Sequence, residues 1–247
     1  MLRRNETAFQ AKATNAVNIL LAAIPRDEAA PLLDHAERFS LTSGEWASDS
    51  GRVPMLWLPE TAVLSFGEEM GGRFVECGIV GREGVVGWEP LTGLAPTRHP
   101  VGVLVGGTAL AVPADRVAPV CDGRPRLAAT LLRYRETLVS QLRSTVAARL
   151  QLRPDGRLAR WLCMLHDRVE GDTLDITHLR LAAFLNARRA SITDCLHLLE
   201  GERVIRCTRG KIFVRDRAAL EAAAGAGYGQ AEAVHRSLIG PFGKGRC

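Results

Sequence analysis

The stretch from Asp175 to Val214 constrains the fold more than any other part of this 247-residue chain. Two apolar patterns of helical period are separated by a break at Asn186-Ala187-Arg188. In the second pattern the apolar side chains recur at i, i+3, i+4 and i+7, which places them on one helix face: Ile192, Cys195, Leu196 and Leu199. Asn tolerates the left-handed backbone that a tight turn between helices needs. We therefore predict a helix-turn-helix, with a first helix capped by Thr177 and a second running from about Arg189 to Glu200.

A small β-hairpin is expected directly after these helices. Val204-Ile205 and Ile212-Phe213-Val214 read as two short strands. The residues between them, Thr208-Arg209-Gly210-Lys211, form a glycine-containing turn with a basic tip. A hairpin in this position is typical of a winged helix.

The charge of this stretch favours an anionic partner. From Thr177 to Arg217 there are nine basic and four acidic residues, so the net charge of +5 equals that of the whole chain. The expected solvent face of the second helix is polar, with Arg189, Thr193, Asp194 and His197. A compact module that carries the excess positive charge is a candidate binder of the phosphate backbone of DNA. The alternative is that an Arg-rich helix is simply a solvated surface.

Composition and cysteine placement narrow the class of protein. The hydrophobic fraction of 47% suits two modest cores, and no apolar run reaches the length of a transmembrane helix. Ile19 to Pro25 precedes charged residues rather than a cleavage site, so we expect a cytoplasmic protein. The six cysteines are scattered without a CxxC pair, which predicts free thiols and neither zinc nor an iron–sulfur cofactor. Oxidation of Cys195 would disturb the second helix, so a redox role there stays open.

The residues from Phe39 to Pro113 show a sequence pattern typical of β-strands. Short apolar runs alternate with Gly, Pro and Asp/Ser, and Gly71-Gly72 is a hairpin signal, so we expect a small β-barrel or jelly roll. Such a barrel raises the hypothesis of a metal-dependent oxygenase, which needs two or three neighbouring histidines. The segment offers His99 alone, with His35 before it, and the chain holds no hydrolase, P-loop or zinc-protease motif. We therefore expect no enzyme activity, no metal and no cofactor.

A long helix is predicted to follow the barrel. Pro125 fits its first turn, Pro154 lies beyond its end, and one apolar stripe is close to a coiled-coil seam: Leu127, Leu131, Leu138, Leu142 and Val146. Shorter helices are expected at 114–120, at 157–168 and, capped by Asp216, at 217–224. We expect four parts: a barrel at 18–123, a dimerisation helix at 124–152, a winged helix-turn-helix at 153–224, and a Gly-rich flexible tail at 225–247.

This order of parts resembles the Crp/Fnr family of transcription regulators, which are similar to the cyclic-AMP receptor protein. The resemblance covers roughly residues 20–228 and is most specific at Gly78 to Gly87 and at Thr177 to Val214. It implies an α+β fold with an N-terminal double-stranded β-helix or jelly-roll barrel of the cyclic-nucleotide-binding type. It also implies a homodimer on a palindromic double-stranded DNA site, with RNA polymerase as a partner if the protein activates transcription.

The resemblance also assigns residues to DNA. Arg189 falls where the family reads guanine, and Asp194 stands where the cyclic-AMP receptor protein has a second arginine, so the target sequence should differ. Ala190 replaces a glutamate of that protein. The remaining expected DNA contacts flank these positions or lie in the wing: Thr177, His178, Arg188, Ser191, Thr193, Arg209 and Lys211.

The effector loop departs from the family pattern. Arg98 falls near the position that binds a cyclic-nucleotide phosphate, but Trp88 occupies the place of the ribose-binding carboxylate and Glu89 is shifted by one. Glu89 and Arg98 are thus the candidate effector residues, and the effector itself stays open. The alternative to DNA binding is a small-molecule or redox sensor whose winged helix docks a protein partner.

Overall fold

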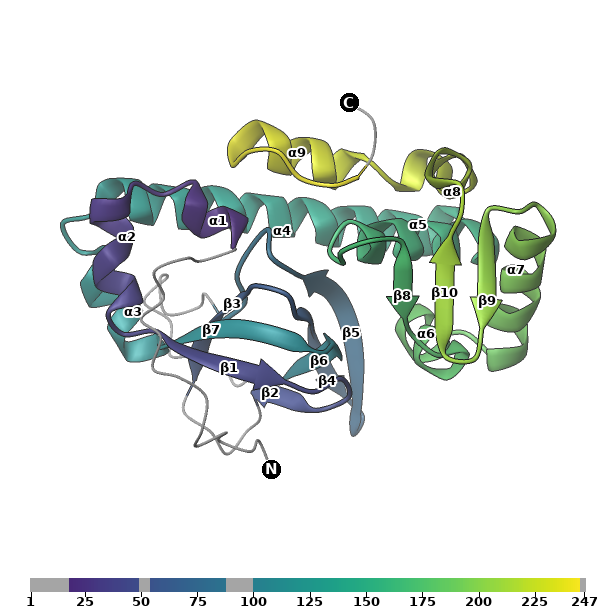
Figure 1. Cartoon of the computed structure of the whole chain (residues 1–247), viewed down its shortest axis with the longest axis horizontal. Helices are drawn as coiled ribbons and strands as arrows, with labels where there is room; N and C mark the ends of the chain where they lie inside the picture. The colour runs from purple at the N-terminus through teal and green to yellow at the C-terminus, as the bar shows by residue number, and fades with distance from the viewer. Residues whose placement is uncertain (1–17, 49–53, 88–99, 245–247) are drawn as a thin grey trace. The chain divides into compact units, whose positions relative to one another are not determined.

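The computed structural model describes residues 18–48, 54–87 and 100–244, and these form two compact units. Of these described residues, the first unit comprises those up to 136 and 238–240, and the second comprises 137–237 and 241–244. The helix α4 (Pro125–Gln151) contributes to both (Figure 1). The expected antiparallel sheets, long helix and helix-turn-helix are confirmed. Among the helices of the described ranges, none has the length and apolar character needed to cross a bilayer.

Two antiparallel sheets form the centre of the first unit. One has the strand order β1-β7-β3, and the other has β2-β6-β4-β5. Two short helices precede the strands and a third follows them. The bounds are α1 (Ile19–Ala22), α2 (Arg26–Leu33), β1 (Glu37–Leu41), β2 (Trp46–Ser48), β3 (Met55–Pro59), β4 (Val63–Met70), β5 (Arg73–Val80), β6 (Val101–Val105), β7 (Gly107–Pro113) and α3 (Ala114–Cys121). The core is mainly aliphatic, with Leu56, Leu58, Leu64 and Leu110 fully buried.

The turn from Gly81 to Gly84 packs against the first half of α4. A Cβ on Gly84 would lie 1.9 Å from Cζ of Tyr134, so only glycine leaves room for this buried ring. Asn18 donates to the carbonyl oxygens of Gly84 and Pro59, at 2.9 and 2.8 Å. At the first turn of α4, the amide of Leu127 donates to Oε2 of Glu28, at 2.8 Å. This carboxylate satisfies one of the free amides that begin every helix.

The apolar face that α4 leaves exposed overlaps the predicted seam only in part. Leu127, Leu131 and Leu138 are buried within the chain, with at most 4% of their surface exposed. The exposed large apolar side chains of α4 are Leu132, Val146 and Leu150, at 53%, 58% and 77%. Periodicity marks every apolar position of a helix, but it does not say which of two adjacent stripes the chain itself covers.

The second unit contains the predicted winged helix-turn-helix. Its elements up to the wing are α5 (Pro154–His166), β8 (Thr173–Asp175), α6 (His178–Leu185), α7 (Arg189–Gly201), β9 (Ile205–Thr208) and β10 (Lys211–Val214). The sheet order β8-β10-β9 adds a third strand to the expected hairpin. Asn186, between α6 and α7, has φ of 46°, the left-handed turn conformation that the sequence predicts.

Residues 225–227 and 230–238 are helical, although the glycine content of residues 225–247 led us to expect a flexible tail. Asp216 caps α8 (Arg217–Ala224) by accepting from the amide of Ala219, at 2.9 Å. The short helix η2 (Gly225–Gly227) and α9 (Gln230–Leu238) follow. His235 and Phe242 are buried and their rings lie 4.9 Å apart. We call residues 225–244 the C-terminal segment.

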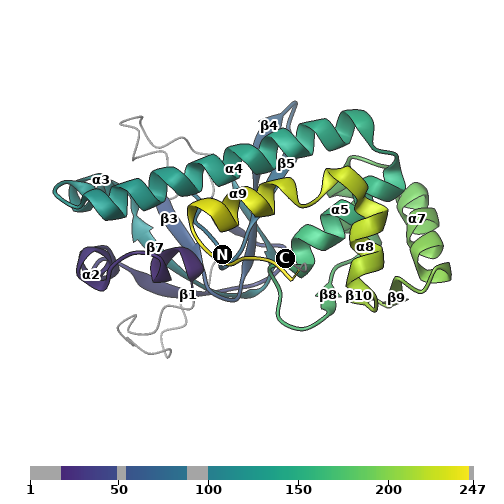
Figure 2. The ribbon, with the colours of Figure 1, turned by 90° about the horizontal axis from the view of Figure 1, so that it is seen from above.

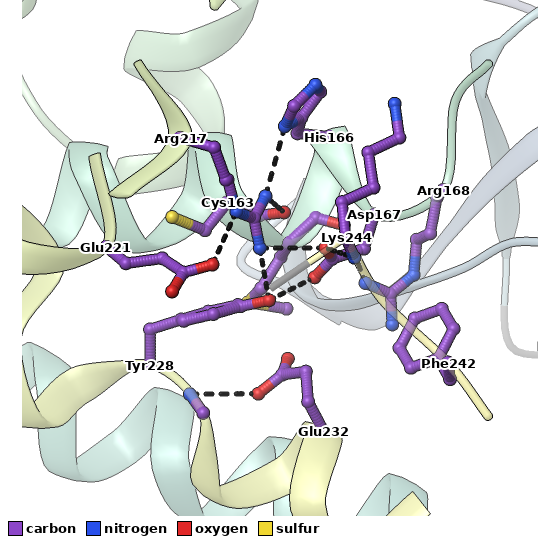
Figure 3. Close-up of polar contacts among 12 residues, drawn as sticks. Cys163, His166, Asp167, Arg168, Arg217, Glu221, Tyr228, Glu232, Phe242 and Lys244 are labelled. Atoms are coloured by element: carbon purple, nitrogen blue, oxygen red, sulfur yellow. Dashed lines mark hydrogen bonds and ion pairs between the residues drawn. The ribbon is translucent and has the colours of Figure 1, made fainter. Parts of the chain in front are cut away.

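A buried polar cluster holds the C-terminal segment to α5 and α8 (Figure 3). The carboxylate of Asp167, fully buried, accepts from Nη2 of Arg217 at 2.8 Å and from the Tyr228 hydroxyl at 2.5 Å. It also accepts from the backbone amide of Lys244, at 2.9 Å. The Arg217 guanidinium donates in addition to Tyr228 and to Glu221. Each of these donors thus points to an acceptor, which is what makes buried charges tolerable.

His166 extends the cluster and gives it a pH dependence. Arg217 can only donate, so Nδ1 of His166 accepts from it at 3.1 Å, and Nε2–H donates to Asp172 at 3.0 Å. Burial, and then the nearby Lys244 and Arg217 charges, lower the pKa of His166 below its ordinary value of 6.5. The histidine is therefore neutral in the folded protein at neutral pH.

We expect the stability of the second unit to fall in mild acid because of His166. The unfolded chain has the higher histidine pKa, so it takes up the proton first. The stabilisation from neutral His166 is complete above about pH 6.5 and is lost as the pH falls through the lower pKa of the folded state. Urea unfolding at about pH 7.5 and about pH 5.5 should show a larger loss of unfolding free energy for the wild type than for His166→Gln. Parallel losses in the two proteins would contradict this assignment.

Candidate nucleic-acid interface

The second helix of the helix-turn-helix, α7, presents a basic N-terminus to solvent. Its apolar side, with Ile192, Leu196 and Leu199, is buried, and this fixes which side faces outward. Arg188 is the N-cap residue in an extended conformation, and both Arg188 and Arg189 are exposed. Because a helix N-terminus carries partial positive charge and free amides, the two arginines add to an anion-attracting end.

A hydrogen-bonded chain couples α6 to α7 beside Arg189. The Thr193 hydroxyl donates to the carbonyl oxygen of Arg189, at 3.1 Å, and this uses its one proton. Its oxygen therefore accepts from Nδ1–H of His178, at 3.2 Å. Partial burial, followed by the Arg189 and His197 charges, lowers the pKa of His178. His178 and Thr193, both predicted to contact DNA, are thus hydrogen-bonded to each other.

The wing carries the remaining predicted cations. Gly210 has φ of 75°, the left-handed conformation that lets Arg209 and Lys211 flank a tight turn. Nζ of Lys211 lies 3.4 Å from Oδ1 of Asp175 on β8, and both side chains are more than half exposed. Exposed pairs of this kind contribute at most about 1 kcal/mol, so a phosphate could displace the aspartate. The sequence did not predict Asp175 as a neighbour of Lys211, because the strand that brings it there, β8, has only three residues and is too short to show a strand pattern.

The other predicted residues lie at the same end of the module. Thr177 is the N-cap of α6 and accepts from the amide of Arg180, at 3.2 Å. Thr177 and Asp194 are exposed, and Ser191 is half-buried. Arg206, exposed on β9, is a further wing cation that the motif comparison did not single out. The signal was present in the alternation along β9, where Ile205 points inward and Arg206 outward.

The structure bears on Arg217 and Cys195, but not on the two candidate effector residues. Arg217, counted above among the basic residues of the module, is largely buried in the polar cluster and adds nothing to this surface. Glu89 and Arg98, the candidate effector residues, lie outside the described residues. For Cys195, burial raises the pKa of the thiol, and this disfavours the reactive thiolate at neutral pH.

What this surface can do chemically follows from its donors. The surface offers the guanidinium groups of arginines, the ammonium group of a lysine, hydroxyl groups and the free amides of a helix N-terminus. These are the groups that bind phosphate oxygens and base edges in DNA. The described residues of the surface include no group of three His, Cys, Asp or Glu side chains able to hold a metal ion. The geometry therefore favours recognition of an anionic polymer.

The comparisons with known proteins agree with this geometry. Residues 156–223 match the model of the Crp-like helix-turn-helix domain, and no curated protein matches the sequence. Among solved structures, a CRP-family transcriptional regulator of Thermus thermophilus is 22% identical, with a TM-score of 0.61 over 77% of this chain and 97% of that one. FixK2 of Bradyrhizobium japonicum is 15% identical, with a TM-score of 0.62 over 77% and 98%.

A third structure shows the same fold in a regulator with a stated ligand. The c-di-GMP-responsive global regulator CLP of Xanthomonas campestris is 15% identical, with a TM-score of 0.60 over 77% of this chain and 99% of that one. At these identities the likeness establishes the fold. The chain therefore carries a Crp-like helix-turn-helix domain within the fold of the CRP/FNR regulators.

Proposed function

From its Crp-like helix-turn-helix domain over residues 156–223, we propose that this chain is a transcription regulator that binds a palindromic DNA site as a homodimer. The observation that carries the proposal is the exposed basic start of α7, with Arg188 and Arg189, next to the basic wing. Helix α7 enters the major groove and reads base edges there. The wing cations and the residues around the helix starts hold the phosphate backbone: Thr177, His178, Arg188, Ser191, Arg209 and Lys211.

Two residues of α7 supply the sequence preference. Arg189 reads a guanine, because its planar fork matches the two acceptors on that base. Asp194, exposed further along the helix, accepts from a cytosine amino group or orients Arg189. Thr193 ties the backbone of Arg189 to His178, so the reading helix is held to the helix that supports it.

The exposed stripe on α4 supports the homodimer. Val139 and Leu142 are half-buried, and Val146 and Leu150 are exposed. Their steps of three and four residues are those of a coiled-coil seam, and a second copy of the same helix would cover them. The pairing is self-complementary, as a two-fold interface requires. Two recognition helices related by that axis would meet two half-sites about one helical turn apart.

The first test is a selection of random duplex DNA on the purified full-length protein at near-physiological salt. We expect an enriched two-fold symmetric sequence and a steep fall of affinity with added salt, because phosphate binding releases counterions. Docking to a protein partner, the alternative function, has no such dependence on DNA sequence and salt. Recovery of random sequence with a shallow salt slope would overturn the proposal.

Replacement of Arg189 should remove base reading specifically. We expect Arg189→Ala to cost about 1–3 kcal/mol on the selected site and to relax preference at one base pair. The matched control is Arg209→Ala in the wing, which should weaken selected and random duplexes alike and lower the salt slope by about one. Binding titrations on both duplexes at two salt concentrations measure these effects. Equal losses on the two duplexes for Arg189→Ala would contradict its role as a base reader.

A further inference from the structure

The junction between α4 and α5 connects the proposed dimerisation helix to the helix-turn-helix domain within the second unit. Helix α4 ends at Gln151 and α5 begins at Pro154, so two residues join them. The proposed dimer seam from Val139 to Leu150 lies on one side of this junction, and the Crp-like domain lies on the other. Any change of angle here would move one relative to the other, because both are stiff elements.

One buried arginine bridges the junction. Arg160, on α5 and 6% exposed, donates from Nη2 to the hydroxyl of Thr145, at 3.1 Å, and more weakly to the carbonyl oxygen of Gln141, at 3.5 Å. Both acceptors belong to α4. Its Nε donates to the carbonyl oxygen of Gly227, at 2.8 Å. A single planar guanidinium therefore ties α4, α5 and the C-terminal segment together.

The C-terminal segment closes directly over the same junction. A Cβ on Gly227 would lie 2.4 Å from Cδ1 of Leu152, the first residue after α4, so the backbone of η2 touches the connection itself. Figures 1 and 2 both show α8 beside α5, and η2, which follows α8 directly, packs against both helices. Burial lowers the pKa of Arg160, and the negative charge of Glu232 on α9, itself 4% exposed, opposes that effect. Arg160 thus stays charged, with an opposite charge close by.

The polar cluster secures the segment in this place. Tyr228 follows η2 by one residue and donates to the buried Asp167, which is also held by Arg217 and by the amide of Lys244. Further along, the Arg168 guanidinium lies over the Phe242 ring, 5.1 Å from its centre. The segment is therefore fixed to α5 and α8 on both sides of α9.

We propose that Arg160 and the C-terminal segment form a brace that fixes the angle between α4 and α5, and thereby the separation of the two DNA half-sites that the dimer accepts. Arg160 is a positioning residue in this role, and it touches no DNA. The inference rests on the proposed function, since it requires dimerisation through α4 and base reading by α7. A buried charge stabilises a fold poorly compared with apolar packing, whereas its forked hydrogen bonds define one geometry.

The brace predicts a loss of spacing selectivity that is separate from base selectivity. One extra base pair moves a half-site by about 3.4 Å and turns it by about 35°, so a rigid dimer should discriminate strongly against it. We expect Arg160→Met to reduce that discrimination about tenfold, while the sequence preference within each half-site is unchanged. The experiment measures binding of full-length wild type and variant to the selected palindrome with its spacer lengthened and shortened by one base pair.

Three further variants serve as controls for this experiment. Arg160→Lys retains the charge and should restore part of the selectivity. Arg124→Met makes the same exchange outside the brace, at a half-buried guanidinium that bonds the Val120 carbonyl, and it should keep wild-type selectivity. If Arg160→Met does not fold, as judged by circular dichroism, Tyr228→Phe loosens the segment without touching Arg160 and should reduce spacing selectivity in the same direction.

The outcomes separate the two proposals. A folded Arg160→Met protein, or Tyr228→Phe in its place, that selects spacers as strictly as the wild type would overturn the brace and leave the proposed function standing. A wild type that selects no two-fold site would overturn the proposed function, and the brace with it. Broadened spacing together with relaxed base preference would also overturn the brace, because it would show a general loss of structure.

Discussion

Val146→Asp on α4 is expected to dissociate the homodimer and to weaken binding to the palindrome by about two to four orders of magnitude. Val146 is 58% exposed in the single chain, so a charge there does not disturb the chain's own core. In the proposed dimer the same position lies in the seam, where an unpaired carboxylate would be desolvated opposite its own copy. The affinity falls because two half-sites held by one dimer gain the effective concentration that separate monomers lack.

The neighbouring position supplies the control for this prediction. Ala147 is exposed and lies next to the stripe rather than in it, so Ala147→Asp adds the same charge at a place that faces solvent. Sedimentation or light scattering should show monomers for Val146→Asp and dimers for Ala147→Asp and the wild type. DNA titrations should then show that Ala147→Asp binds the palindrome with wild-type affinity, whereas Val146→Asp does not. A dimeric Val146→Asp protein would mean that the copies meet elsewhere.

Asp167→Ala is expected to lower the unfolding free energy of the second unit by about 3–5 kcal/mol. The carboxylate is fully buried, and its loss would remove one of the ion pairs of the Arg217 guanidinium, which is only 15% exposed and would keep its contact with Glu221. Tyr228 and the amide of Lys244 would also lose their acceptor. Urea unfolding followed by circular dichroism measures the change.

Asp172→Ala is the matched comparison within the same cluster. Asp172 accepts one hydrogen bond from His166 and is 54% exposed, so water can replace the lost partner. We expect its loss to cost less than about 1 kcal/mol. Equal destabilisation by the two substitutions would show that burial of Asp167 is not what makes the cluster important. The Asp167 variant should also release the C-terminal segment, which limited proteolysis would detect.

The sequence by itself determined the local structure of the helix-turn-helix and its wing. Thr177 and Asp216 cap their helices, Asn186 takes the left-handed turn, and Gly210 turns the wing, as their residue types predict. These features depend on hydrogen bonds and backbone preferences within three or four residues, so a sequence pattern contains all the information they need. The bounds of the long helix α4 agree with its two flanking prolines for the same reason.

Tertiary structure alone decided which surfaces are covered. Leu131 and Val146 belong to one periodic pattern, yet the first is buried in the chain and the second is exposed. Arg217 and Arg189 are both arginines of one basic stretch, yet Arg217 is held by Asp167, fifty residues earlier in the chain. The C-terminal segment is rich in glycine, but contacts with Arg160 and Asp167 order it. Such contacts join residues that only the completed fold brings together, so local composition does not encode them.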